Sequence, residues 1–262
     1  MIVQDSPTGS RRFVMTMEQH TAFADHLAGT FGNAEFAPID NDAVRYVIAN
    51  HDAGWRKVDP DVHINPATGL PYHLAETPFE FTSQTMRGST DFNAQQSSLA
   101  GLISSMHTAG LLNGRYGLAP PGILARFDGE KKIFAEGVLS DELARQEQLK
   151  QKIDVSEDVV WTAYKQLQFF DMLSLYFHSK TAGSRGTGTF PDVPTKSGKD
   201  VTVTITERDD DSYALDPFPF AASGTAFSFA GRWMEPIKGE ADGPAAFDAA
   251  AVSQQTVTLV SG

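Results

Sequence analysis

Residues 156–178 read SEDVVWTAYKQLQFFDMLSLYFH, and this stretch predicts the central helix of the fold. Ser156 is a residue type that caps helix N-termini, and the two acidic residues after it suit the first turn of a helix. The second half is apolar nearly all round, through Leu167, Phe170, Leu173, Leu175 and Phe177. A helix without a polar face is buried in a protein core. We therefore expect this helix to be buried.

Outward from this helix, capping residues and helical periodicity predict further helices. We expect them at residues 16–29, 41–51, 92–112 and 130–152, the last of these strongly charged and exposed. Residues 52–78 contain several Pro, Gly and Asp and show no period, which predicts a long structured loop. At the N-terminus, residues 2–3 and 11–15 flank a turn-like SPTGS and predict a short hairpin.

The pattern changes after Lys180. Residues 183–188 (GSRGTG) read as a linker, with a weaker alternative as an anion-binding loop. Polar and apolar residues alternate at residues 201–206 and 225–233, which predicts strands. We therefore expect a mainly α fold, with a helical domain over residues 1–180 and a β-rich extension over residues 181–262. We expect the extension to pack on the helical body and cover a pocket.

Composition excludes several functional classes. The 262 residues include no Cys, which excludes disulfides, thiolate zinc sites, iron–sulfur clusters and cysteine nucleophiles. The net charge of −12 disfavours non-specific binding to nucleic acid or anionic membranes. No apolar run approaches the length of a membrane span, and residues 1–12 lack a signal-peptide core. We expect a cytoplasmic protein without a nucleic-acid or membrane partner.

The sharpest local signal is His51 followed by Asp52, at the end of the apolar helix 41–51. At a helix end, adjacent side chains can converge on one ion, and imidazole with carboxylate suits Fe, Mn, Zn or another divalent ion. His20, His107 and Asp171 lie on three other predicted helices. A carboxylate inside an apolar helix is costly unless it is paired or metal-bound. Helical metal sites are built from such inward-facing side chains.

Several of these residues have a structural alternative. A hydrogen bond to a neighbouring helix explains His107 equally well. Asp52 is also explained as the partner that orients His51, or as the first residue of a turn at Gly54. His178 lies seven positions after Asp171, near the same helix face. It is a candidate ligand, a candidate hydrogen-bond donor to a ligand, or only a partner of the helix dipole.

The order His, His-Asp and a distant Asp resembles the HD-domain superfamily of metal-dependent hydrolases. Three stretches carry this likeness: His20 with its following residues 27–28 (LA), residues 47–54 (VIANHDAG) and residues 170–173 (FDML). More closely, the chain is similar to the uncharacterised bacterial DUF3891 family. The matching stretches are residues 51–55 (HDAGW), 69–72 (GLPY), 105–117 (SMHTAGLLNGRYG) and 167–176 (LQFFDMLSLY). This likeness covers most of residues 13–178.

The HD resemblance implies a fold and a metal site. The fold would be an HD-domain-like helical bundle with the short N-terminal hairpin and the β-rich C-terminal extension. His20, His51, Asp52 and Asp171 would bind one divalent ion (Fe, Mn, Zn or Mg), and His107 would help to hold a second. The DUF3891 likeness itself implies no activity.

For the chemistry, we consider Asp52, Arg87 and Arg115 as catalytic candidates. Asp52 would orient a metal-bound water, and the two arginines would grip a phosphate. The leading hypothesis is a metal-dependent hydrolase of a small, possibly phosphorylated molecule. One alternative is an HD-type di-iron oxygenase, with His178 or a loop His completing the ligand set. The other is a non-enzymatic helical scaffold or binding protein. The apolar residues 216–220 (DPFPF) also suit a homodimer contact.

Overall fold

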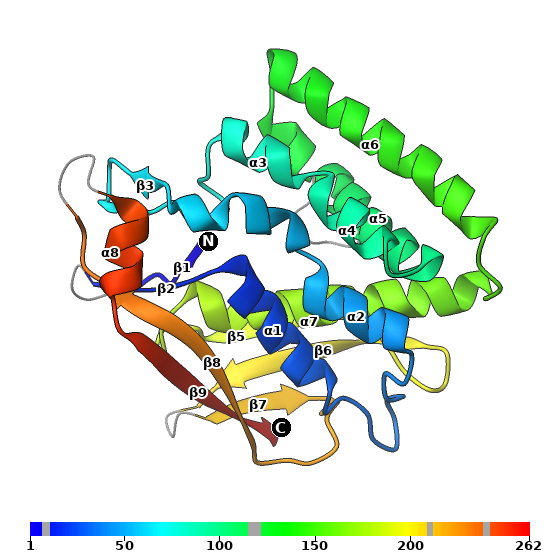
Figure 1. The fold of residues 1–262 in the computed structure, drawn as a ribbon. Helices are drawn as coiled ribbons and strands as arrows, with labels where there is room; N and C mark the ends of the chain where they lie inside the picture. The colour runs from blue at the N-terminus through cyan, green and yellow to red at the C-terminus, as the bar shows by residue number, and fades with distance from the viewer. Residues whose placement is uncertain (7–10, 115–121, 209–211, 238–241) are drawn as a thin grey trace.

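The computed structural model describes residues 1–6, 11–114, 122–208, 212–237 and 242–262 (Figure 1). Within these residues the helices are α1 Met17–Ala28, α2 Asp42–Asn50, α3 Phe79–Thr85, α4 Gly88–Ala94, α5 Ser98–Asn113, α6 Gly129–Lys150, α7 Glu157–Ser179 and α8 Gly243–Ala249. Short 3-10 turns cover Ala53–Lys57, Asp59–Asp61 and Ile123–Arg126. The strands are β1 Ile2–Val3, β2 Arg12–Met15, β3 Ile64–Asn65, β4 Leu70–Pro71, β5 Thr187–Pro194, β6 Asp200–Glu207, β7 Ser212–Asp216, β8 Thr225–Met234 and β9 Val252–Ser261.

Seven of the described strands form one curled sheet in the order β1-β2-β8-β9-β7-β6-β5. All neighbours are antiparallel except β7 and β9, which run parallel. Alternation explains the sheet, because residues two apart on a strand share a face. The inner face is buried through such pairs on the central strands: Val203 and Ile205, Phe227 and Phe229, and Val257 and Leu259.

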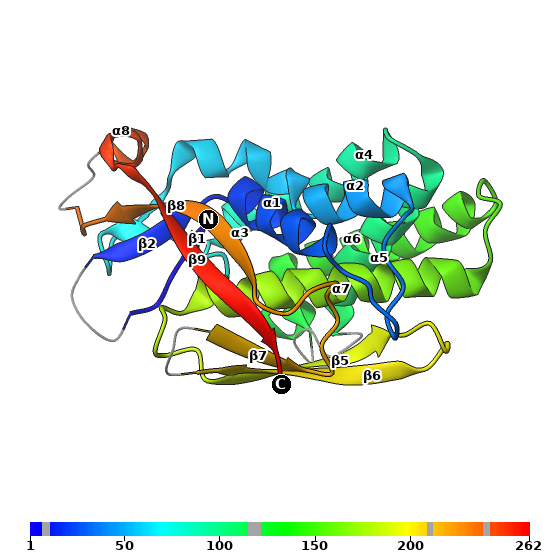
Figure 2. The ribbon, with the colours of Figure 1, turned by 90° about the horizontal axis from the view of Figure 1, so that it is seen from below.

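Helix α7 lies between the sheet and the other helices. It contacts β5 on one side and α1, α2 and α5 on the other (Figure 2). This position explains its composition, since Leu167, Phe170 and Phe177 are fully buried in the main hydrophobic core. Helix α1 joins the same core through Phe23 and Leu27 and also packs on β8. A buried α7 was expected, but it packs against a sheet as well as against helices.

The expectation of a mainly α, HD-domain-like bundle is wrong. About 47% of the chain is helical and 23% is strand, and the seven-stranded sheet curls into a half-barrel. The reason lies in the pairing of β2 with β8, in which Arg12 is opposite Met234 and Phe13 opposite Trp233. The N-terminal hairpin thus extends the same sheet as the C-terminal strands, on both sides of the boundary expected at residue 180. The sheet's apolar face requires helices to cover it, which makes the fold a layered α+β structure.

Smaller differences concern the segments around the loop. The helix expected at 92–112 is two helices, α4 and α5, and the side chain of Ser97 caps α5 by accepting from the backbone N–H of Ala100. The expected loop 52–78 contains two 3-10 turns and the small β3–β4 hairpin. The segment read as a linker leads into β5, and the backbone N–H groups of Gly183, Arg185 and Gly186 donate to the carboxylate of Glu207. Helix α8 interrupts the predicted run of strands.

Among the described residues, we find no helix with the length and apolar character that crossing a bilayer requires.

Candidate metal centre

Helix α1 carries His20 into the core. The side chain of Thr16 caps this helix by accepting from the backbone N–H of Gln19, and the Gln19 side chain accepts from the backbone N–H of Thr16. This reciprocal cap fixes where the helix begins. One turn later the His20 side chain is fully buried. Its Nε2 lies 3.1 Å from Oδ1 of Asp171.

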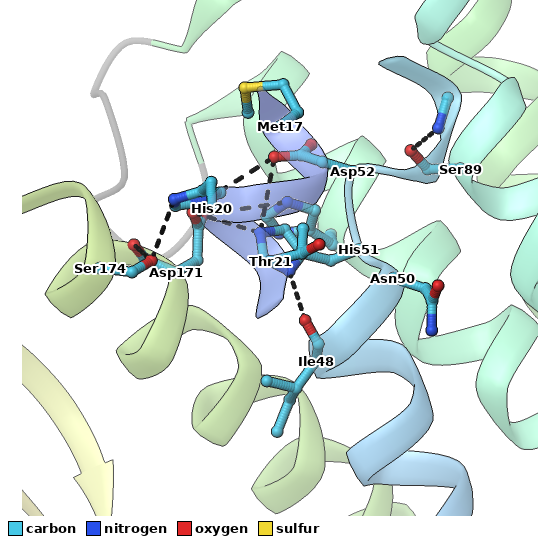
Figure 3. Close-up of polar contacts among 12 residues, drawn as sticks. Met17, His20, Thr21, Ile48, Asn50, His51, Asp52, Ser89, Asp171 and Ser174 are labelled. Carbon is cyan, nitrogen blue, oxygen red and sulfur yellow. Dashed lines mark hydrogen bonds and ion pairs between the residues drawn. The ribbon is translucent and has the colours of Figure 1, made fainter. Parts of the chain in front are cut away.

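Helix α2 ends at the His51–Asp52 pair. His51 Nδ1 donates to the backbone carbonyl of Ile48 at 2.8 Å, which leaves Nε2 facing the interior. Nε2 lies 3.5 Å from Asp52 Oδ2 and 3.4 Å from Asp171 Oδ1 (Figure 3). The fixed Nδ1 therefore selects the nitrogen that a metal can use, as backbone acceptors do for metal-binding histidines.

The turn after Asp52 is held by close backbone packing. The backbone N–H of Gly54 donates to Ser89 Oγ at 3.0 Å. A Cβ on Gly54 would meet the carbonyl oxygen of Thr85 at 2.4 Å, so only glycine fits there. This packing of the Ala53–Lys57 turn against α3 and α4 fixes the position from which Asp52 projects.

Helices α5 and α7 complete the cluster. Asp171 lies midway along α7, and its side chain is 6% exposed. Its Oδ1 faces His20 and His51, whereas its Oδ2 lies 3.9 Å from Nε2 of His107 on α5. Two sets of ligand atoms each lie within 4.8 Å of one another: His20 with His51 and Asp52, and His51 with His107 and Asp171. The structure thus brings all five predicted metal ligands into two overlapping sets that share His51, and all of them except Asp52 are buried.

The spacing of the ligand atoms suits a metal ion. Ligands at about 2.0–2.2 Å from a tetrahedral or octahedral metal lie about 2.8–3.6 Å from one another. The distances from His20 to Asp171 and from His51 to both carboxylates, 3.1, 3.4 and 3.5 Å, fall in this range. The distance from His20 Nε2 to Asp52 Oδ2 is 4.0 Å, a few tenths longer. Within the part of the chain that the structure describes, Nε2 of His51 and Nδ1 of His107 have no hydrogen-bond partner.

The cluster shifts the pKa values of its members. Burial alone would lower the pKa of His51, but the charges of Asp52 and Asp171 outweigh burial and raise it to about 9. Burial would raise the pKa of Asp171, but His20 and His51 hold it well below its usual value. Burial lowers the pKa of His107, against the attraction of Asp171. Asp171 is therefore ionised, and such strongly perturbed groups are typical of functional sites.

Asp52 is the most accessible ligand. Its side chain is 15% exposed, whereas that of His20 is fully buried and that of His107 is 3% exposed. Water and small molecules therefore reach the cluster most readily along Asp52.

Arg87, one of the two predicted catalytic arginines, is paired outside the cluster. The Arg87 guanidinium lies 2.6 Å from Asp141 on α6 and stacks over the ring of Phe134. Arg115 lies outside the described residues.

His178 is not positioned as a ligand. Its Nδ1 lies 3.1 Å from Nδ1 of His20, on the side of the ring opposite the cluster. Burial, together with the charges of His20 and Arg185, holds the pKa of His178 well below its usual value. Sequence reasoning missed Ser174, whose Oγ lies 3.2 Å from His20 Nδ1. The signal was its spacing, one turn after Asp171 on the same helix face.

Comparison with known proteins gives a family and no activity. No curated protein and no solved structure matches the chain, and the HD-domain resemblance finds no support. Residues 1–235 match the family described as "Protein of unknown function (DUF3891)", a range that includes every residue of the cluster. The chain therefore belongs to the DUF3891 family.

Proposed function

We propose that the protein is a metal-dependent hydrolase of a small phosphoester, with His20, His51, Asp52 and Asp171 binding one divalent ion. The observation that carries this proposal is that His20 Nε2 and His51 Nε2 each lie within 3.5 Å of a carboxylate oxygen, His20 of Asp171 and His51 of both Asp52 and Asp171. Buried carboxylates are costly without a partner of opposite charge. A divalent cation would balance the charges of Asp52 and Asp171.

The ligand set favours hydrolysis. A divalent ion held by nitrogen and oxygen ligands supplies Lewis acidity and acidifies a bound water. In this chain, Asp52 is the ligand with access to solvent, and its carboxylate suits the task of orienting that water. The Nδ1 bond of His51 to Ile48 keeps its Nε2 directed at the ion.

One observation favours a second candidate, a di-iron oxygenase. Asp171 directs one oxygen at His20 and His51 and the other at His107, as a carboxylate that bridges two ions does. The cluster supplies five protein side chains for two ions, because His178 is engaged with His20. Mononuclear hydrolysis needs only four of them and is the better-supported proposal.

The test is elemental analysis of protein purified without chelator, followed by a panel of phosphomonoesters and phosphodiesters. We expect about one divalent ion per chain and turnover of at least one substrate. His20→Gln should lose both metal and turnover. His26→Gln is the matched control, since His26 is an exposed histidine on the same helix.

Each other outcome contradicts the proposal. Stoichiometric metal without turnover on any phosphoester would exclude this hydrolysis. Two irons per chain with coloured, O₂-sensitive spectra would indicate the oxygenase. Absence of metal, with a His51→Ala variant that only loses stability, would indicate a scaffold.

A further inference from the structure

Two buried side chains, Ser174 and His178, contact the ring of His20 at Nδ1, the nitrogen that faces away from the cluster. We propose that His178 is a positioning residue that accepts a hydrogen bond from His20 Nδ1 and so keeps His20 Nε2 free to bind the metal. This inference rests on the metal site of the proposed function but not on the reaction. It assigns a role to a buried histidine that lies outside the ligand set.

The two nitrogens of His20 have different neighbours. Nε2 faces Asp171 Oδ1 at 3.1 Å, and Nδ1 faces His178 Nδ1 at 3.1 Å. A nitrogen that binds metal carries no proton, so the single proton of a neutral imidazole must be on the other nitrogen. Metal binding at Nε2 therefore requires a proton on Nδ1, and an acceptor stabilises a buried N–H. A neutral His178 that accepts at Nδ1 carries its own proton on Nε2, which has no hydrogen-bond partner among the described residues.

Two acceptors stand at that proton. Nδ1 of His178 is the first, and Ser174 Oγ is the second at 3.2 Å. Because Ser174 donates its own hydrogen to the backbone carbonyl of Asp171, its oxygen is left to accept. Asp171, Ser174 and His178 are spaced i, i+3 and i+7 along α7, which puts them on one face. One helix thus supplies a metal ligand and both groups that orient another ligand.

The contact between His178 and His20 is shielded from solvent. The His178 side chain is fully buried, and its ring packs against Phe229 of β8 and Phe23 of α1, with centroids 4.6 and 5.1 Å away. An apolar residue at this position would leave His20 Nδ1 with Ser174 alone. The population of the other His20 tautomer, with the proton on Nε2, would then increase, and this tautomer cannot bind metal at Nε2.

The experiment measures Co²⁺ binding to the full chain after removal of metal by a chelator, using the visible absorption of the bound ion. Loss of hydrogen bonds behind a metal ligand costs about 10–100-fold in metal affinity. We expect His178→Leu to weaken Co²⁺ binding by about that factor and to change the absorption spectrum. We expect His178→Asn, whose Oδ1 replaces Nδ1 as acceptor, to restore both.

Two controls separate positioning from packing. Phe229→Leu loosens the surroundings of His178 without removing the acceptor, so it should lower thermal stability and leave Co²⁺ affinity unchanged. Ser174→Ala removes the second acceptor and should weaken binding less than His178→Leu does. Equal affinity of wild type and His178→Leu, or equal weakening in the Leu and Asn variants, would overturn the inference alone. Wild-type protein that binds no Co²⁺ would overturn both the inference and the proposed function.

Discussion

His51 faces two carboxylates, and its raised pKa predicts how stability changes with pH. The pKa is about 9 in the fold against an ordinary value of 6.5. A group whose pKa is raised by folding stabilises the fold fully below its unfolded value and loses that contribution as pH rises to the folded value. In protein stripped of metal, the free energy of unfolding should therefore fall by about 3 kcal/mol between pH 6.5 and 9.

Urea unfolding at a series of pH values in the presence of chelator checks this. A His51→Asn variant is the control, because it should lack the decline. Stability of the wild type that stays level or rises across this window would contradict the ion pairs assigned to His51.

A substitution at Gly54 should change the free energy of unfolding measurably. A Cβ there would lie 2.4 Å from the Thr85 carbonyl oxygen and 3.0 Å from the Ser89 backbone nitrogen. Gly54→Ala should cost about 1–3 kcal/mol, because overpacking forces the backbone to shift, and should weaken metal binding through Asp52. The same substitution at Gly137, where nothing lies within 4 Å, should stabilise α6 by about 0.5–1 kcal/mol. Unfolding curves that show equal effects would contradict this account of the turn.

Residue types identified the candidate ligands from the sequence, because buried acids and helix-end His-Asp pairs are unusual. Arg87 could not be assigned in this way: a surface arginine pairs with whichever acid the fold brings near, here Asp141 on α6. The contact between His20 and His178 spans 158 residues, and no local pattern reveals it.

At the scale of the element, α7 contributes several fully buried side chains to the main hydrophobic core. Phe177 is fully buried, and its ring meets Tyr213 of β7 and Phe23 of α1 edge-on. Phe177→Ala should lower the free energy of unfolding by about 3–5 kcal/mol through the cavity it leaves. Ile133→Ala on α6 is the control, since Ile133 is 69% exposed and surface changes stay within about 0.5 kcal/mol. Chemical denaturation distinguishes these values, and a similar small loss in both variants would argue against a core at α7.

The elements that the sequence predicts well are those with local signals. The polar caps and periodicity of α1, α2 and α7 place them close to their observed bounds. The break between α4 and α5 was missed because it depends on a cap at Ser97 inside an otherwise continuous pattern. The Gly-rich segment before β5 was read as a linker because its partner, Glu207, comes from a later strand.

At the scale of the molecule, the candidate metal ligands come from parts of the chain that unfolding separates. His20, His51, His107 and Asp171 lie on or at the end of four different helices. At a free metal concentration one hundred times the dissociation constant, metal binding should stabilise the fold by about 2.7 kcal/mol. Chelator should therefore lower Tm by roughly 5–10 °C for a chain of this size. Asp171→Asn should show no chelator effect, and a wild-type Tm that is equally insensitive would contradict coupling between the metal and the fold.

The sheet explains why the overall fold could not be predicted. Alternation identified several of the β strands, but nothing local indicated that β2 pairs with β8, more than two hundred residues later. That pairing joins the N-terminal hairpin and the C-terminal strands in one sheet. The fold class therefore depended on a long-range pairing, whereas the candidate site depended on residue types that the sequence displays directly.

Anomalous diffraction tests most directly whether the candidate ligands bind a metal. The data are recorded from crystals of metal-loaded protein on both sides of the absorption edge of the ion. We predict an anomalous peak about 2.0–2.2 Å from His20 Nε2, His51 Nε2, Asp52 Oδ2 and Asp171 Oδ1. Crystals that contain the ion but show no peak between these four side chains would contradict the claim.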